Sequence, residues 1–246
     1  MTHYRYLIVG GGMTAAAAIN GIRQADSEGS VGLISKEAHP PYNRPPLSKG
    51  LWKGKPIEKI FRKTDQPGVD VRLERTATSL DPAAKTVVDD KGITYTYDKL
   101  LLATGGIPRQ LPFGNSNIIY FRTLDDYYSL KGLTDRRHRI AVIGGGFIGS
   151  EIAAALAGAG QEVVMAFPDE GIGGAIFPTD LSQFLNDYYR QQGVDVRAGE
   201  MITGIEGRSG KHVLQTKSRN EIAADAVVAG IGIRPTQSWL KAPGWL

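Results

Sequence analysis

The sequence repeats itself, and this repeat constrains the fold more than any other feature. The pentapeptide at residues 68–72 recurs unchanged at residues 193–197, 125 positions later. Around each copy lies the same order of segments: an apolar run ending in three glycines, an alanine-rich helical stretch, a second apolar run, and a closing apolar run with a glycine exit. Two copies of one strand-helix-strand unit predict two domains, each built on a parallel sheet.

The boundaries of these segments follow from the apolar runs and glycines. The opening runs are residues 7–12 and 141–146, the helices 15–22 and 151–157, the second strands 31–35 and 162–167, and the closing runs 100–106 and 226–232. Residues 85–97 predict a hairpin with an Asp-Lys-Gly turn, and residues 212–222 predict its counterpart, turning near residues 218–220. We expect each hairpin to form a small antiparallel layer covering one face of its parallel sheet.

The glycines after the opening strands form two dinucleotide-binding motifs. Gly10, Gly12 and Ala15 give G-x-G-x-x-A, and Gly144, Gly146 and Gly149 give G-x-G-x-x-G. In such motifs the first glycine permits the turn, the second lets a pyrophosphate approach the backbone, and the third allows close packing of helix on strand. Glycine turns that bind no nucleotide are the alternative, but two matches related by a repeat argue against it. The predicted fold class is therefore α/β, with two Rossmann-like three-layer domains whose helices lie on one face.

An acidic residue about 20 positions beyond the third glycine is expected to accept hydrogen bonds from the ribose hydroxyls of the adenosine. Asp169 lies 20 residues after Gly149. Because an acid disfavours a 2′-phosphate, the second half is predicted to bind NAD rather than NADP. In the first half Glu37 is the candidate, although the neighbouring Lys36 leaves open that this turn is only solvated.

Composition excludes several classes of function. The 246 residues contain no Cys, which rules out disulfides, cysteine nucleophiles and cysteine-bound metals on this chain, and we expect no metal site. The net charge of +4 is modest and spread along the chain; the densest basic run, residues 136–139, is expected to be a solvated turn, so no nucleic-acid partner is predicted. No apolar stretch approaches the roughly 18 residues that span a bilayer. A protein without a membrane partner, in the cytoplasm, is the expectation.

Four segments resemble those of a known family. Residues 41–49, PYNRPPLSK, are similar to the P-Y-x-R-P-P-L-S-K signature of FAD-dependent NADH reductases of ferredoxins and of apoptosis-inducing-factor-like flavoproteins. Residues 102–109, LATGGIPR, resemble the A-T-G-x-x-P-R turn of the same group, and residues 144–151 and 167–171 resemble its apoptosis-inducing-factor-like side. The resemblance extends from residue 6 to about residue 239.

This resemblance implies a site in each half. The residues implied to hold FAD are Gly10, Gly12, Ala15, Glu37, Arg44, Lys49, Thr104, Gly105 and Arg109. The residues implied to hold NAD(H) are Gly144, Gly146, Phe147, Ile148, Gly149, Glu151, Asp169, Gly230 and Gly232. Lys49 and Glu151 are implied to be catalytic: a buried Lys49 would lie near the reactive edge of the flavin and pair with Glu151, because a buried lysine needs a carboxylate partner.

The implied activity is that of an NADH-dependent flavoprotein oxidoreductase. NADH, preferred over NADPH, would deliver hydride to N5 of the flavin, and electrons would leave singly to a ferredoxin-type iron-sulfur protein or another acceptor. The lack of Cys fits this branch and excludes those that use a redox disulfide or a cysteine peroxidase site. Oligomeric state is not indicated by the sequence.

Members of this family are longer, and after the second closing strand they return to the first domain. We therefore expect an FAD-binding domain over residues 1–113 that is incomplete, an NAD(H)-binding domain over residues 114–236, and a tail over residues 237–246. The alternative to a reductase is a truncated, non-catalytic dinucleotide-binding module with weak or no FAD binding.

Overall fold

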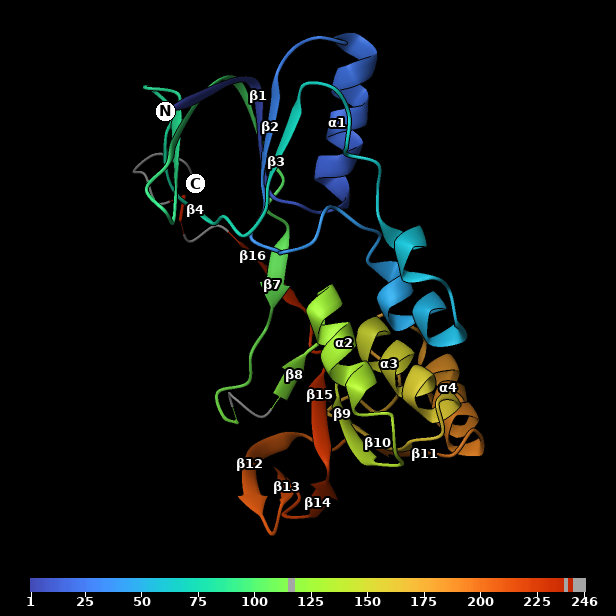
Figure 1. Cartoon of the computed structure of the whole chain (residues 1–246). Coiled ribbons are helices and arrows are strands. Elements are labelled where there is room, and N and C mark those ends of the chain that lie inside the picture. Colours follow the sequence, from blue (N-terminus) through green and yellow to red (C-terminus); the bar gives the residue numbers. More distant parts are fainter. Residues whose placement is uncertain (115–117, 237–238, 241–246) are drawn as a thin grey trace. The chain divides into compact units, whose positions relative to one another are not determined.

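The computed structural model describes residues 1–114, 118–236 and 239–240 and shows an α/β protein (Figure 1). The chain forms two compact units. Unit 1 consists of residues 1–44 and 56–107 and the chain from Pro235 onward; unit 2 consists of Pro45–Lys55 and Pro108–Arg234. Most of the predicted tail, residues 237–238 and 241–246, lies outside the described residues.

Unit 1 is built on a six-stranded sheet of order β3-β2-β1-β6-β5-β4. Strands β3, β2, β1 and β6 are parallel, whereas β5 and β4 are antiparallel additions. The strands are β1 (Thr2–Val9), β2 (Val31–Ile34), β3 (Val69–Arg72), β4 (Ala77–Asp81), β5 (Thr86–Asp89) and β6 (Thr94–Leu102).

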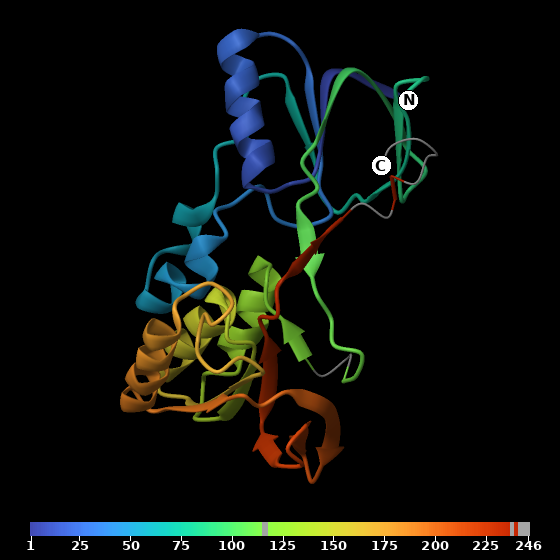
Figure 2. The same cartoon turned by 180° about the vertical axis from the view of Figure 1, so that it is seen from behind.

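Helix α1 (Met13–Ala25) lies beside strands β1 to β3, as both views show (Figure 1; Figure 2). It packs its buried residues Ala15 and Ile19 against Ile8, Val31 and Leu33 on one face of the sheet. The side chains that alternate with Ile8 along β1 pack on the other face, in a cluster that includes buried residues of β4, β5 and β6. Because successive side chains of β1 point to opposite faces of the sheet, this strand contributes to a hydrophobic layer on each face.

Unit 2 repeats this plan with a five-stranded parallel sheet of order β11-β10-β9-β15-β8. Its strands are β8 (Ile118–Tyr120), β9 (Arg139–Ile143), β10 (Glu162–Phe167), β11 (Val194–Ala198) and β15 (Ala226–Ala229). A separate antiparallel sheet contains β12 (Ile202–Arg208), β13 (Lys211–Thr216) and β14 (Glu221–Ala224). The helices are α2 (Leu124–Gly132), α3 (Phe147–Gly158) and α4 (Thr179–Gln191).

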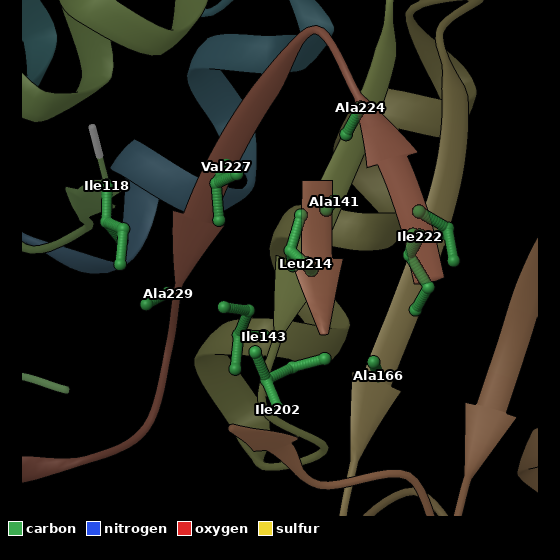
Figure 3. Packing of buried hydrophobic residues seen from close by; sticks show 11 residues of the cluster. Ile118, Ala141, Ile143, Ala166, Ile202, Leu214, Ile222, Ala224, Val227 and Ala229 are labelled. Atoms are coloured by element: carbon green, nitrogen blue, oxygen red, sulfur yellow. The ribbon is translucent and has the colours of Figure 1, made fainter. Parts of the chain in front are cut away.

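The antiparallel sheet of unit 2 is held to the parallel sheet by a hydrophobic cluster (Figure 3). Ile202, Leu214 and Ile222 from the antiparallel strands pack against Ala141 and Ile143 of β9 and against neighbouring residues of β10 and β15. The helices α2, α3 and α4 lie against the same parallel sheet. Unit 2 is therefore a three-layer structure, as the sequence predicts.

The internal repeat corresponds to equivalent strands. In unit 1 the repeated pentapeptide contains β3, and in unit 2 it contains all of β11 except its last residue. Each is an edge strand of its parallel sheet, preceded by a glycine with positive φ (Gly68, 70°; Gly193, 86°). Both predicted hairpins are present: β5 and β6 turn through residues 90–93, and β13 and β14 turn through residues 217–220. In unit 1 the antiparallel strands continue the main sheet instead of forming a separate one, because the long strand β6 pairs with β1 and β5.

Short elements occur where the chain passes between the units. Three 3₁₀ helices span Pro45–Ser48, Gly50–Lys53 and Ile57–Ile60, and strands β7 (Gly106–Pro108) and β16 (Ile233–Pro235) pair as a two-stranded sheet. The unit boundaries differ from the expected domains at residues 45–55 and 108–113, which group with unit 2, and at residues 235–236, which group with unit 1. Within that unit, Trp52 packs edge-on against Tyr127 of α2, with ring centroids 5.6 Å apart.

Within the described residues, no helix is long and apolar enough to cross a membrane. The same residues contain no cluster of three or more His, Asp or Glu side chains with metal-binding geometry. The cytoplasmic location expected from the sequence stays a prediction.

Candidate dinucleotide-binding and redox sites

The glycine turn of unit 1 joins β1 to α1. Gly10 has a φ of 118°, and a Cβ at this position would overlap the carbonyl oxygen of Ala103, which follows β6. A Cβ at Gly11 would overlap the Ser35 hydroxyl. Only glycine fits these two positions, because the turn lies directly against the ends of two neighbouring strands.

Gly12 differs from the two glycines before it. It is the N-cap of α1 with an extended backbone (φ −91°), and an added Cβ would meet no atom of the described chain within 4 Å. Among the described side chains, none caps this helix, and its first turn contains no acid. The first N–H groups of α1 therefore lack a side-chain cap at the positive end of the helix dipole, which suits a pyrophosphate.

Unit 2 has an equivalent glycine turn between β9 and α3, and here the helix lies closer to the turn. Gly144 has a φ of 117°, and its Cβ would lie 2.6 Å from the carbonyl oxygen of Gly230. A Cβ at Gly149 would overlap the carbonyl oxygen of Gly144, whereas unit 1 accommodates the fully buried Ala15 at the equivalent position. The third glycine of the second motif is therefore required by packing.

Gly146 is the counterpart of Gly12. It is the N-cap of α3, has a φ of −81°, and an added Cβ would have no neighbour within 4 Å in the described chain. No described side chain caps α3, and its first turn lacks acids. Phe147 and Ile148, which begin the helix, are 55% and 42% exposed. The uncapped N–H groups at the start of α3 and the open position beside Gly146 suit a second dinucleotide.

The closing strands place further predicted residues at these turns. In unit 1, Thr104 and Gly105 follow Ala103; the Thr104 hydroxyl donates to Thr236 O (3.3 Å) and Gly105 has a φ of 62°. In unit 2, Gly230 lies against the Gly149 backbone, and Gly232 O accepts from the Arg109 N–H (2.9 Å). Arg109 belongs to unit 2, where its Nε also donates to Ile233 O (3.3 Å).

The predicted ribose acid of unit 1 is part of a polar cluster. The Glu37 carboxylate forms an ion pair with Arg44 and accepts a hydrogen bond from the Tyr42 hydroxyl, and the guanidinium of Arg44 lies 5.2 Å from the Tyr42 ring centre. Burial alone would lower the pKa of Arg44, but Tyr42 and Glu37 raise it above its ordinary value. Glu37 is therefore held in place rather than solvated, while Lys36 is exposed. A carboxylate has lone pairs beyond these two contacts with which to accept from ribose hydroxyls.

The predicted ribose acid of unit 2 follows β10. Asp169 is exposed, and its backbone carbonyl accepts from the Gly199 N–H (2.9 Å). It begins a loop whose Gly173 N–H donates to Gly145 O (2.8 Å) in the glycine turn. The structure therefore ties the segment after Asp169 to the turn that would hold the pyrophosphate.

The two residues implied to be catalytic meet within unit 2. Lys49 Nζ lies 3.0 Å from Glu151 Oε1, which confirms the predicted ion pair. The expectation that Lys49 is buried is wrong: its side chain is 57% exposed, against 24% for Glu151. Ser48 is the buried member, at 5% exposure, and its hydroxyl donates to Glu151 Oε2 (2.5 Å). The inner oxygen of the carboxylate is thus held by a hydroxyl, and the cation lies at the surface of the unit.

Sequence analysis missed three contributors to these sites. Tyr42 and Ser48 lie inside the proline-rich segment, where their positions could have suggested a role. Asn186 of α4 donates to Glu170 O (2.9 Å) and accepts from the Ile172 N–H (3.0 Å), and only its place on a helix could have drawn attention to it.

Comparison with known proteins agrees with this geometry. Residues 4–245 match the family model described as pyridine nucleotide-disulphide oxidoreductase. The chain belongs to this family. Its relatives within the family include a 5,5′-dehydrodivanillate O-demethylase ferredoxin reductase subunit of Sphingobium sp. (36% identical, covering 99% of this chain and 62% of the relative). Another is mitochondrial apoptosis-inducing factor 1 of Dictyostelium discoideum (32% identical, 97% and 50%).

Solved structures of this family have the same fold. The putidaredoxin reductase-putidaredoxin complex superimposes with a TM-score of 0.91 at 28% identity, covering 99% of this chain and 62% of that one. The ferredoxin reductase for the CYP199A2 system of Rhodopseudomonas palustris gives a TM-score of 0.88 at 27% identity, covering 96% and 60%. The chain therefore spans about three fifths of the length of these proteins. It contains no Cys.

Proposed function

We propose that this chain is the nucleotide-binding part of an NADH-dependent FAD flavoprotein oxidoreductase that passes electrons to a ferredoxin-type protein. The observation that carries the proposal is the duplicated open glycine turn, at Gly12 in unit 1 and Gly146 in unit 2. Two dinucleotide sites in one chain suit an enzyme that moves electrons between two different dinucleotides. The ferredoxin reductases among its relatives support the choice of partner.

FAD is proposed to bind in unit 1. Its pyrophosphate would lie on the N–H groups of α1, beside the turn that follows β6, with Glu37 accepting from the ribose and Arg44 holding that carboxylate. The proposed contacts within unit 1 are Gly10, Gly12, Ala15, Glu37, Arg44, Thr104 and Gly105. When bound, FAD would supply a ring that accepts two electrons as hydride and releases them singly.

NADH is proposed to bind in unit 2. The contacts are Gly144, Gly146, Phe147, Ile148, Gly149, Gly230 and Gly232 at the turn, with Glu151 one helical turn further on and Asp169 at the ribose. A carboxylate at Asp169 would accept from two hydroxyls and repel a 2′-phosphate, which favours NADH over NADPH.

Lys49 and Glu151 are the proposed catalytic residues. The hydrogen bond from Ser48 and the ion pair with Lys49 occupy both carboxylate oxygens of Glu151, so the carboxylate is held in one orientation. A fixed cation beside a carboxylate stabilises negative charge that develops close to it. Because the Lys49 side chain is largely exposed, its removal is expected to cost little stability.

The test is reduction of ferricyanide by NADH, with and without added FAD. We expect turnover that depends on FAD, and a lower rate of flavin reduction in Lys49→Ala at unchanged stability. The matched control is Lys53→Ala, which removes the same charge from an exposed position in the same segment. A folded protein that binds nucleotide but shows no turnover would instead support the non-catalytic module. Equal rates in Lys49→Ala and the control would remove Lys49 from the site.

A further inference from the structure

The two buried residues of helix α4 are both polar. Ser182 and Asn186 are 2% and 4% exposed, whereas Leu181, Phe184 and Tyr188 on the same helix are 41%, 62% and 47% exposed. Residues four apart share one face of a helix, so Ser182 and Asn186 form a buried polar stripe. Burying an amide is costly unless its hydrogen bonds are made, so the partners of Asn186 indicate what this stripe does.

Asn186 holds the backbone of the loop after β10. Its side-chain nitrogen donates to Glu170 O (2.9 Å), and its side-chain oxygen accepts from the Ile172 N–H (3.0 Å). Gly171, between these two residues, lies so close to the helix that a Cβ there would be 2.6 Å from Ser182 Cβ. Residues 170–172 are thus clamped onto α4 by one side chain and one glycine.

The same loop is joined to the glycine turn at its other end. Gly173 N donates to Gly145 O (2.8 Å), and Gly174 N donates to Gly171 O (3.0 Å). Asp169 immediately precedes the clamped residues. A short, hydrogen-bonded path therefore runs from Asn186 through residues 170–173 to the turn at the start of α3. Asp169 directly precedes this path, and its backbone carbonyl accepts from the Gly199 N–H (2.9 Å).

We propose that Asn186 is a positioning residue that sets the distance between the Asp169 carboxylate and the N-terminus of α3, and so determines selection against a 2′-phosphate. Asn186 does not touch the ligand and acts through Asp169. Recognition of a ribose by a carboxylate is sensitive to displacements near 1 Å, because both the hydrogen bonds and the repulsion of phosphate depend on placement. The inference rests on the proposed function, since it requires adenosine ribose to bind at Asp169.

The test uses ADP-ribose and 2′-phospho-ADP-ribose as probes, with binding measured by calorimetry on the full chain. The unmodified protein is expected to prefer ADP-ribose. Asn186→Ala should reduce the preference about tenfold, the effect of one lost charge-assisted hydrogen bond. Gln183→Ala, an exposed position on the same helix, is the matched control and should leave the preference unchanged.

A double-mutant cycle with Asp169→Asn separates positioning from general destabilisation. If Asn186 acts through Asp169, then Asn186→Ala changes the preference little once the carboxylate is gone. Equal weakening of both probes in Asn186→Ala, or additive effects in the cycle, would overturn the proposal. If Asn186→Ala does not fold, Asn186→Asp replaces it, because this variant keeps the volume and the acceptor for Ile172 N–H. A reduced preference for ADP-ribose in Asn186→Asp would support the proposal, and equal weakening of both probes would overturn it. Failure of the unmodified chain to bind ADP-ribose would contradict the proposed function and this inference with it.

Discussion

The substitution Gly146→Ala should lower the affinity for NADH while leaving the stability of the fold nearly unchanged. Gly146 has an ordinary extended backbone, with φ −81° and ψ −173°, and its Cβ would meet no described atom within 4 Å. Alanine is a poorer N-cap than glycine by up to about 1 kcal/mol. Alanine also restricts the unfolded chain by about 0.4 to 1 kcal/mol, so the free energy of unfolding should change by less than about 1 kcal/mol.

Binding of NADH should change far more. The new methyl group would occupy the space through which a pyrophosphate approaches the first N–H groups of α3. Loss of one hydrogen bond to a charged group is worth about 1.5 to 3 kcal/mol, which raises Kd about 10- to 150-fold. The assay is titration of NADH fluorescence, paired with urea unfolding of the same sample.

Two other glycines of α3 serve as controls. Gly158→Ala, near the helix end, also adds a methyl group without a described neighbour within 4 Å, and should leave NADH affinity unchanged. Gly149→Ala would overlap the carbonyl oxygen of Gly144 and should lower stability. Unchanged NADH affinity in Gly146→Ala, or its unfolding, would refute the argument that this glycine is present for the ligand.

Two further predictions concern stability. Burial alone would raise the pKa of Asp89, but hydrogen bonds from Tyr95 and from the backbone, with the nearby Arg75, hold that pKa below its usual value. The ionised carboxylate should therefore stabilise the fold above about pH 4, and the free energy of unfolding should fall as acid protonates it. In Asp89→Asn the free energy of unfolding should decline less steeply with falling pH. Trp52→Ala removes the edge-on contact with Tyr127 and the hydrogen bond from the indole to the backbone, and should lower the free energy of unfolding in urea by about 2 to 3 kcal/mol; a loss below 0.5 kcal/mol would show that segment 45–55 is held by other contacts.

The parallel sheets, the two hairpins and the two glycine turns could be predicted because their causes are local in the sequence. A parallel strand ends in glycines wherever the chain must turn sharply against a neighbouring strand, as at Gly10 and Gly144. The repeated pentapeptide indicated equivalent segments in the two halves, and the structure shows that these segments lie at the edge strands β3 and β11. Each feature depends on backbone geometry that only certain residues allow.

The remaining features depend on contacts between distant residues. Segment 45–55 groups with unit 2 because Ser48, Lys49 and Trp52 meet residues of α2 and α3 about 75 to 105 positions away, which no local pattern encodes. The exposure of Lys49 was mispredicted because an ion pair was assumed to be buried. Hydrophobic periodicity could not predict the buried polar residues of α4, because it places polar residues on the exposed face of a helix. Asn186 is buried because backbone groups of a distant loop make its hydrogen bonds, and no sequence motif indicates this.

If the two glycine turns bind two different dinucleotides, each turn can be disabled separately. The measurement is the stoichiometry of FAD and NADH on the unmodified chain, on Gly12→Ala and on Gly146→Ala. We expect one FAD and one NADH per unmodified chain, loss of FAD alone in Gly12→Ala, and loss of NADH alone in Gly146→Ala. Binding of one dinucleotide at both turns, or loss of the same ligand in both variants, would contradict this expectation.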